Sequence, residues 1–363
     1  MYANNNDNKE LRLVHIVYRH GVRTPADTYP NDPHINNDLF PTGWGQITND
    51  GKRNLYEHGR YLRQRYGSFL GSYYSPELYY VQTTDVDRTK VSAQCINAGL
   101  WPPCDSQQWG PINWQPIPIH SEPLHSDSLL LVRKPCPQYH LELNRVLKSK
   151  DVRHKLQELQ PLLDDLSKHT GKKIENFEDV QDVYTTLMSE EASGLVLPQW
   201  TKTFYPERMK EATAFSYVLN AYNDKLNRLK GGVFVKKLIE DWKDVQNAST
   251  RLKAFLYVGH DATIVNILSA LKLWEPQVPN FSANVFFEFS YDRERDEYGV
   301  EIFFRNTVDA FGEPKKLKMP GCEEYFCPMK EFVKLTENVV PEDWDKESRT
   351  DEIGFVHPVL RGP

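Results

Sequence analysis

The sequence predicts an α/β fold in which a mixed, mainly parallel sheet is flanked by helices and carries an inserted helical cap domain. Two short and mostly apolar runs, 11–18 and 254–258, are rich in Val, Leu, Ile and aromatic residues, and polar side chains follow each. Such runs are typical of strands that are buried on both faces of a parallel sheet. Because the segment between them is mostly helical in pattern, we predict a cap at 119–232 and an α/β domain formed by 1–118 and 233–363.

Composition narrows the class of protein. The 363 residues are enough for a large core, and the formal net charge of -6 argues against a nucleic-acid-binding protein. No run of about 18 apolar residues occurs, so no membrane span is predicted. Residues 1–10 are polar and Asn-rich, lack the pattern of a signal peptide, and are expected to form a disordered end.

The first apolar run ends in Arg19, His20, Gly21, Val22, Arg23, Thr24 and Pro25. Gly and Pro at this point force the chain into a loop. In open α/β sheets, ligands bind just beyond the carboxyl ends of such strands, so a histidine between two arginines is suited to an anion. The motif therefore indicates a site for a phosphate ester; the alternative is that the arginines are surface charges and the histidine is a packing residue.

The second apolar run ends in His260 and Asp261. Asp261 can cap the helix that follows, and this structural role is compatible with a catalytic one. The two strand ends together supply two histidines, two arginines and an acid.

These two motifs resemble the signature of the histidine acid phosphatases, RHGxRxP near the N-terminus and His-Asp far downstream. The resemblance extends through the tracts GWGQITNDGKRNLYEHGRYLRQRY, TTDVDRTKVSAQ, WQPIPIH, MPGC and VVPEDW, so it covers most of the chain. The chain is most similar to the prostatic and lysosomal types, including secreted insect enzymes. The resemblance implies a phosphoglycerate-mutase-like fold and hydrolysis of phosphate monoesters without a metal or cofactor.

The segments after the first motif supply a further arginine. Residues 27–42 contain three prolines and are expected to form a wall of the substrate entrance. A helix that Asn49 or Asp50 caps and that runs to about Phe69 is expected to be scaffold. A short strand at 78–82 and a helix at about 90–100 flank Arg88. By its position alone Arg88 could bind an anion or form a surface ion pair. The resemblance implies that it is the third phosphate-binding arginine, oriented by Asp85 or Asp87.

The remaining elements follow from residue patterns. The Pro- and Trp-rich stretch 101–118 indicates a boundary, and Gly231 and Gly232 are expected to end the helical pattern before a helix at 233–242. Alternation at 284–291 and 299–305 predicts a β-hairpin. Apolar residues at helical spacing predict core stripes at Leu156, Leu159, Leu162, Leu163 and Leu166, and again at Phe215, Val218, Leu219, Tyr222 and Leu226.

The predicted chemistry is phosphoryl transfer in two steps. Guanidinium groups match phosphate oxygens, and the predicted phosphate-binding residues are Arg19, Arg23, Arg88 and His260. A neutral His20 would attack phosphorus and form a phosphohistidine. Asp261 would protonate the leaving alcohol and then deprotonate water, so activity should favour acid pH.

The cysteines and possible glycosylation sites bear on the compartment. Cys322 and Cys327 are close enough in sequence to be bridged, Cys95 and Cys104 could form a second bridge, and Cys136 is left over. Asn-X-Ser sequences begin at Asn247 and Asn280. Together with the resemblance, these features predict a secreted or lysosomal glycoprotein.

Other chemistries lack their motifs. No cysteine is followed six positions later by arginine, and GxSxG, GxxxxGKS and HExxH are absent. His120 and His125 lie beside prolines and are expected to serve packing or an interface rather than a metal. Two alternatives stay open: a more selective phosphatase for lysophosphatidate or inositol phosphates, and a secreted binding protein or allergen with vestigial activity. The resemblance to this family suggests a homodimer formed through 109–120.

Overall fold

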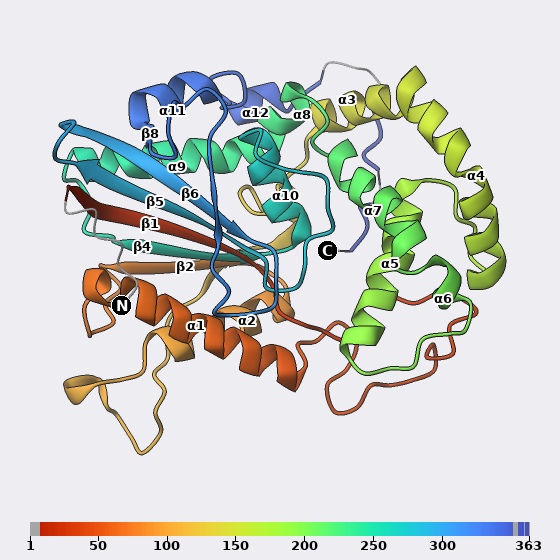
Figure 1. Cartoon of the computed structure of the whole chain (residues 1–363), viewed down its shortest axis with the longest axis horizontal. Coiled ribbons are helices and arrows are strands. Elements are labelled where there is room, and N and C mark those ends of the chain that lie inside the picture. The colour runs from red at the N-terminus through yellow and green to blue at the C-terminus, as the bar shows by residue number, and fades with distance from the viewer. Residues whose placement is uncertain (1–7, 351–354, 359, 363) are drawn as a thin grey trace.

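A computed structural model describes residues 8–350, 355–358 and 360–362, and an eight-stranded sheet is its centre (Figure 1). The strand order is β3-β2-β4-β1-β5-β6-β7, with β8 paired to β6. The strands on the β3 side of β1 are parallel, and those on its other side are antiparallel, so the predicted mixed sheet is confirmed. The strands are β1 (Lys9–Arg19), β2 (Tyr79–Thr84), β3 (His120–Glu122), β4 (Ala254–Gly259), β5 (Asn284–Asp292), β6 (Glu297–Arg305), β7 (Lys315–Leu317) and β8 (Cys327–Pro328).

Helices cover both faces of the sheet, which explains why β1 is apolar on both sides. Leu13 and Val17 pack in one buried cluster, and Val14, Ile16 and Tyr18 pack in another on the opposite face. Alternate residues of a strand point to opposite faces, so β1 contributes to both clusters. One face is covered by α1 (Asn49–Leu70) and α2 (Asp87–Leu100), and the other by α9 (Gly231–Gln246), α10 (Asp261–Ala270) and α11 (Met329–Thr336) (Figure 1).

The inserted segment is mainly helical, as predicted, and lies beyond the carboxyl ends of β1 and β4 (Figure 1). Its helices are α3 (Pro137–Leu147), α4 (Lys150–Thr170), α5 (Phe177–Ala192), α6 (Thr201–Phe204), α7 (Glu207–Leu219) and α8 (Asp224–Leu229). They share a third buried cluster, which Val265 of α10 joins. The remaining helices are α12 (Trp344–Glu347) and two 3-10 turns, Asp105–Gln107 and Leu124–Ser126. The domain boundaries near 119 and 232 stay a prediction.

Several predicted boundaries shift. Gly231 and Gly232 do not end a helix; they form the first turn of α9, where a Cβ would collide with the carbonyl oxygens of Asn266 and Val339. These glycines therefore reflect close packing of backbone rather than a helix stop. The helix predicted from Lys90 begins three residues earlier, which places Arg88 in its first turn.

Two further expectations about chain segments change. The N-terminal strand already begins at Lys9 and pairs with β5 there, so residues 9 and 10 are ordered, whereas 1–7 lie outside the described residues. The predicted stripe from Phe215 to Leu226 is wrong, because α7 ends at Leu219 and α8 starts a new helix at Asp224. Tyr222 falls in the connection and is 41% exposed.

The Cys322–Cys327 disulfide is confirmed, but the predicted Cys95–Cys104 bridge is wrong. Cys95 lies on α2 and packs beside the cluster beneath α1, whereas the Sγ of Cys104 lies 3.4 Å from the Ser72 carbonyl oxygen. Cys136 is a free, buried thiol. Among the described residues, no helix is both long and apolar enough to cross a membrane.

Candidate active site

The ends of β1 and β4 meet because the two strands are parallel and in register from Val14–Ala254 to Arg19–Gly259. The backbone N–H of His20 donates to the Gly259 carbonyl oxygen at 3.0 Å. His20 and His260 are the residues that directly follow β1 and β4, and the centroids of their imidazole rings lie 5.5 Å apart. Backbone pairing of the two strands thus brings together two residues that are separated by 240 positions in the sequence.

Arg19 is buried, with only 1% of its surface exposed, and three groups contact its guanidinium. Its Nη2 lies 3.2 Å from Asp261 Oδ2, and its Nη1 donates to the Pro279 carbonyl oxygen. The guanidinium also lies 4.6 Å from the centre of the Phe281 ring. These contacts fix the plane of the guanidinium, and a fixed plane allows arginine to bind an anion through two parallel hydrogen bonds.

Arg23 and Arg88 complete a group of three buried arginines with Arg19. Arg23 Nη1 donates to the Thr24 carbonyl oxygen at 2.9 Å and to Ser189 Oγ at 3.0 Å. Burial, and then Arg88 and Arg19, lower the pKa of Arg23 to about 9. Burial also lowers the pKa of Arg88 to about 10, while the nearby Asp261 carboxylate opposes this shift. Mutual repulsion of this kind is relieved by an anion bound among the arginines.

The orientation of Arg88 by Asp85 or Asp87 stays a prediction. Asp85, one of these two aspartates, forms an ion pair with Lys90. The Asp261 carboxylate acts on Arg88 by raising its pKa. The position of Arg88 in the first turn of α2 also places it at the positive end of the helix dipole, where a bound anion is favoured.

His20 is neutral, and its hydrogen bond identifies the tautomer. Its Nδ1 lies 2.9 Å from the Gly21 carbonyl oxygen, which can only accept, so Nδ1 carries the hydrogen. Nε2 therefore keeps its lone pair. Burial, followed by the charges of Arg88 and Arg19, holds the pKa of His20 well below 6.5.

His260 occupies the end of β4 with the same preference for the neutral form. Its Nε2 lies 2.9 Å from Thr84 Oγ1 at the end of β2, so a third strand end contributes to the site. Burial and then Arg88 hold the pKa of His260 well below 6.5. The backbone N–H of His260 donates to Thr263 Oγ1 at 3.1 Å, and His260, not Asp261, is the N-cap of α10.

Asp261 is the first residue of α10, and both of its carboxylate oxygens have donors. Oδ1 accepts from the Ala262 backbone N–H at 2.7 Å, and Oδ2 accepts from the Tyr217 hydroxyl at 2.9 Å. Burial raises the pKa of Asp261, but Arg19, then His260 and the Tyr217 hydrogen bond, outweigh burial. The net pKa lies below the usual value, so the carboxylate is ionised when no substrate is bound.

Three side chains at this site are marked by no sequence motif. Tyr217 and Ser189 come from α7 and α5 of the inserted segment, and Phe281 lies in the connection before β5. No local pattern marked the two helical residues, because their partners lie 44 and 166 positions away. Phe281 stood in an Asn-Phe-Ser sequence that we interpreted only as a glycosylation site.

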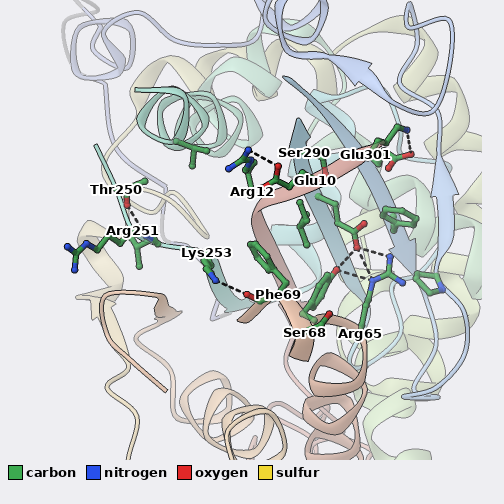
Figure 2. Close-up of a pocket in the computed structure, with 18 of the residues that line it drawn as sticks. Glu10, Arg12, Arg65, Ser68, Phe69, Thr250, Arg251, Lys253, Ser290 and Glu301 are labelled. Carbon is green, nitrogen blue, oxygen red and sulfur yellow. Dashed lines mark hydrogen bonds and ion pairs between the residues drawn. The ribbon is translucent and has the colours of Figure 1, made fainter. Parts of the chain in front are cut away.

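A cavity of about 1090 Å³ lies at the other end of the sheet and is not part of this site (Figure 2). It is lined by residues at the start of β1, roughly 30 Å along the strand from His20. Several of its charged side chains pair with one another: Arg12 with Glu10 at 2.9 Å and Lys9 with Glu301 at 3.4 Å. The arginines at the carboxyl end of β1 instead lower the pKa values of one another.

Comparisons with known proteins identify the class to which this fold and site belong. The family model "Histidine phosphatase superfamily (branch 2)" matches residues 10–305. The chain belongs to this family, as the sequence motifs predicted, and it is a phosphate monoester hydrolase.

Individual relatives are acid phosphatases. The chain is 36% identical to human lysosomal acid phosphatase over 344 residues, covering 93% of this chain and 80% of the relative. It is 34% identical to venom acid phosphatase Acph-1 of Apis mellifera, covering 92% and 86%, and 34% identical to human prostatic acid phosphatase, covering 94% and 89%. A solved structure of Hafnia alvei phytase in complex with myo-inositol hexakis sulphate shares the fold, with a TM-score of 0.71, 19% identity, and coverage of 92% and 98%.

Proposed function

We propose that this chain is an acid phosphatase that forms a phosphohistidine on His20 and uses Asp261 as general acid and base. The observation that carries the proposal is the state of His20: a buried, neutral imidazole whose Nδ1 hydrogen is bound to a carbonyl, beside three arginines. A neutral imidazole has the lone pair that a nucleophile requires, and the arginines supply charge for phosphate oxygens.

Phosphate binding is assigned to Arg19, Arg23, Arg88 and His260. The arginines repel one another in the free enzyme, so a phosphate dianion among them removes an unfavourable interaction as well as forming hydrogen bonds. His260 would donate through the ring nitrogen that carries its hydrogen. Phosphoryl transfer needs mainly such charge stabilisation and alignment, and little else from the protein.

The first step forms a bond between His20 Nε2 and phosphorus and breaks the bond between phosphorus and the alcohol oxygen. Asp261 gives its proton to that oxygen as it leaves. In the second step a water attacks phosphorus, Asp261 takes the proton from the water, and the phosphorus–nitrogen bond breaks. Inorganic phosphate is released with His20 neutral and Asp261 protonated again.

Asp261 has a low pKa in the free enzyme, so its protonation requires that the bound substrate raise this pKa. Arg19 is the strongest group that lowers this pKa. A phosphate on Arg19 adds negative charge beside the carboxylate, so we expect the pKa of Asp261 to rise in the complex. Acid pH then supplies the proton, which is the basis of the proposed acid optimum.

Acid-quench labelling tests the covalent step. The enzyme is mixed with a ³²P-labelled aryl phosphate at pH 5, quenched, and analysed for an acid-labile, alkali-stable phosphoprotein. His20→Ala should give no label and no turnover. Turnover by His20→Ala without a phosphoprotein would overturn the mechanism.

Asp261→Asn tests the general acid separately. We expect its turnover of an alkyl phosphate to fall by about 10²–10⁴, while inhibition by inorganic phosphate is retained. Loss of phosphate binding would instead give Asp261 a structural role. If the unmodified enzyme binds phosphate but turns over no substrate, the binding-protein alternative is favoured. A panel of phosphotyrosine, lysophosphatidate and phytate would measure substrate selectivity and so test the alternative of a more selective phosphatase.

We also propose a secreted or lysosomal location and a homodimer. Relatives are named as lysosomal, prostatic and venom acid phosphatases, and the Cys322–Cys327 disulfide fits an oxidising compartment. The segment 101–119 projects from the body of the molecule, and its Trp109 is 59% exposed (Figure 1). Light scattering of the enzyme and of Trp109→Ala tests the dimer; a monomeric mass for the unmodified enzyme at micromolar concentration would reject it.

A further inference from the structure

We infer that Tyr217 of α7 is a positioning residue that holds Asp261 in both of its protonation states and couples the inserted helices to the reaction. This inference rests on the proposed role of Asp261. It assigns a function to a side chain that lies outside the two strand-end motifs and contacts one of them.

The contact is specific to one carboxylate oxygen. Asp261 Oδ1 is occupied by the backbone N–H of Ala262 within its own helix. Oδ2 is the oxygen on which two separate elements converge, Arg19 at the end of β1 at 3.2 Å and the Tyr217 hydroxyl of α7 at 2.9 Å. The carboxylate is thus fixed between the sheet and the cap rather than by its own helix alone.

Packing alone does not account for a tyrosine at this position. The side chain is 1% exposed and lies in the buried cluster of the inserted segment, where phenylalanine would contribute the same apolar ring. A buried phenol hydroxyl needs a partner, and the partner here is Asp261. Burial and then the Asp261 charge hold the pKa of Tyr217 well above 10, so the hydroxyl keeps its hydrogen.

A phenol hydroxyl suits a carboxyl group that must both give and take a proton. It donates to the ionised carboxylate, and after rotation it accepts from the protonated carboxyl. A lysine or arginine at the same place could only donate, and would oppose protonation. Tyr217 can therefore keep Oδ2 oriented throughout the cycle without a second positive charge beside Arg19.

The conservative variant Tyr217→Phe removes the hydroxyl and keeps the ring. We expect kcat to fall by about ten-fold, as for loss of a hydrogen bond to a charged group. The hydrogen bond favours the ionised carboxylate, so its loss should also move the alkaline limb of the kcat–pH profile upward by about 0.7 pH unit. Inhibition by inorganic phosphate at pH 5 should change little, because the arginines are untouched.

Tyr139→Phe is a matched control. Tyr139 is a buried tyrosine of α3 in the same helical segment, and its hydroxyl donates to the Asn220 carbonyl oxygen at 2.9 Å, far from the motifs in sequence. It should lower the melting temperature without moving the pH profile. Replacement of Tyr217 by 3-fluorotyrosine, a stronger donor that keeps the hydroxyl, should move the alkaline limb downward, and it provides a readout even where Tyr217→Phe folds poorly.

The outcomes separate this inference from the proposed function. Opposite shifts of the limb in Tyr217→Phe and the fluorotyrosine enzyme support a positioning role. If Asp261→Asn is inactive while both Tyr217 variants keep the normal kcat and limb, Tyr217 is merely structural and the inference is wrong. If Asp261→Asn keeps normal turnover, the proposed general acid is itself wrong, and the role of Tyr217 falls with it.

Discussion

His58 is a buried histidine outside the reacting groups, and its lowered pKa makes the free energy of unfolding depend on pH. Its Nδ1 lies 3.1 Å from Arg305 Nη2 and 3.3 Å from the hydroxyl of Tyr18, the residue before the first motif. Burial, and then the charge of Arg305, lower the pKa of His58 from 6.5 to about 3. Below pH 6.5 the unfolded chain therefore binds a proton that the folded enzyme excludes, so stability falls as the pH is lowered.

The magnitude follows from this difference in pKa. Each pH unit between the two pKa values corresponds to 1.36 kcal/mol, so lowering the pH from 7 to 4.5 should cost about 2.5 kcal/mol through His58 alone. His58→Asn places an amide oxygen near the position of Nδ1 and cannot titrate. Any loss of packing in the variant is the same at both pH values and cancels in the comparison.

Urea unfolding of both proteins at pH 7 and pH 4.5 measures this effect. We expect the free energy of unfolding of the unmodified enzyme to fall by about 2.5 kcal/mol more than that of His58→Asn over this interval. Equal losses in the two proteins would refute the reasoning, because they would mean that His58 takes up its proton equally in the folded and unfolded states.

Three further predictions concern two contacts between elements and the binding of phosphate. Ser189→Ala removes one of the two acceptors of Arg23 Nη1 and should weaken inhibition by inorganic phosphate about five-fold, the equivalent of one net hydrogen bond, in a steady-state assay at pH 5. Gly59→Ala should lower stability by about 1–3 kcal/mol in denaturant unfolding, because its Cβ would collide with the backbone of α2; Gly67→Ala on the same helix meets nothing closer than 3.7 Å and should not destabilise. Inorganic phosphate at about 100 times its dissociation constant should stabilise the enzyme by about 2.7 kcal/mol in thermal melts at pH 5, and an unchanged melting temperature would contradict the proposed anion site.

The elements that could be predicted are those whose causes are local in sequence. The hairpin expected at 284–291 and 299–305 is found at Asn284–Asp292 and Glu297–Arg305, because period-two alternation and a charged turn encode it directly. Helix α1 ends within one residue of the prediction, but the predicted cap is wrong: the N-cap is Thr48, whose side chain accepts from the Gly51 N–H, rather than Asn49 or Asp50. The proximity of the two motifs followed from a general property of parallel strands, whose carboxyl ends share one edge.

The missed features depend on contacts that no local pattern records. Gly231 and Gly232 were ambiguous, since glycine serves equally to end a helix and to admit a neighbouring backbone, and only the packing of α9 decides between the two. The nine-residue separation of Cys95 and Cys104 permitted a bridge, but the helical geometry of α2 directs Cys95 elsewhere. Tyr217 carries no sequence signal of its role, because its partner Asp261 lies 44 positions away.

Protonation states illustrate the same limit in chemical terms. The motifs identify which side chains are present, but neutrality of His20 depends on complete burial beside Arg88 and Arg19, which arises only when β1, β4 and α2 are assembled. Residue type is therefore encoded locally and reactivity is not. The groups that react come from strand ends fixed by backbone pairing, whereas Ser189 and Tyr217, which hold two of them, come from the inserted helices. We therefore expect substitutions in α5 and α7 to alter phosphate affinity and pH dependence while the strand-end chemistry persists.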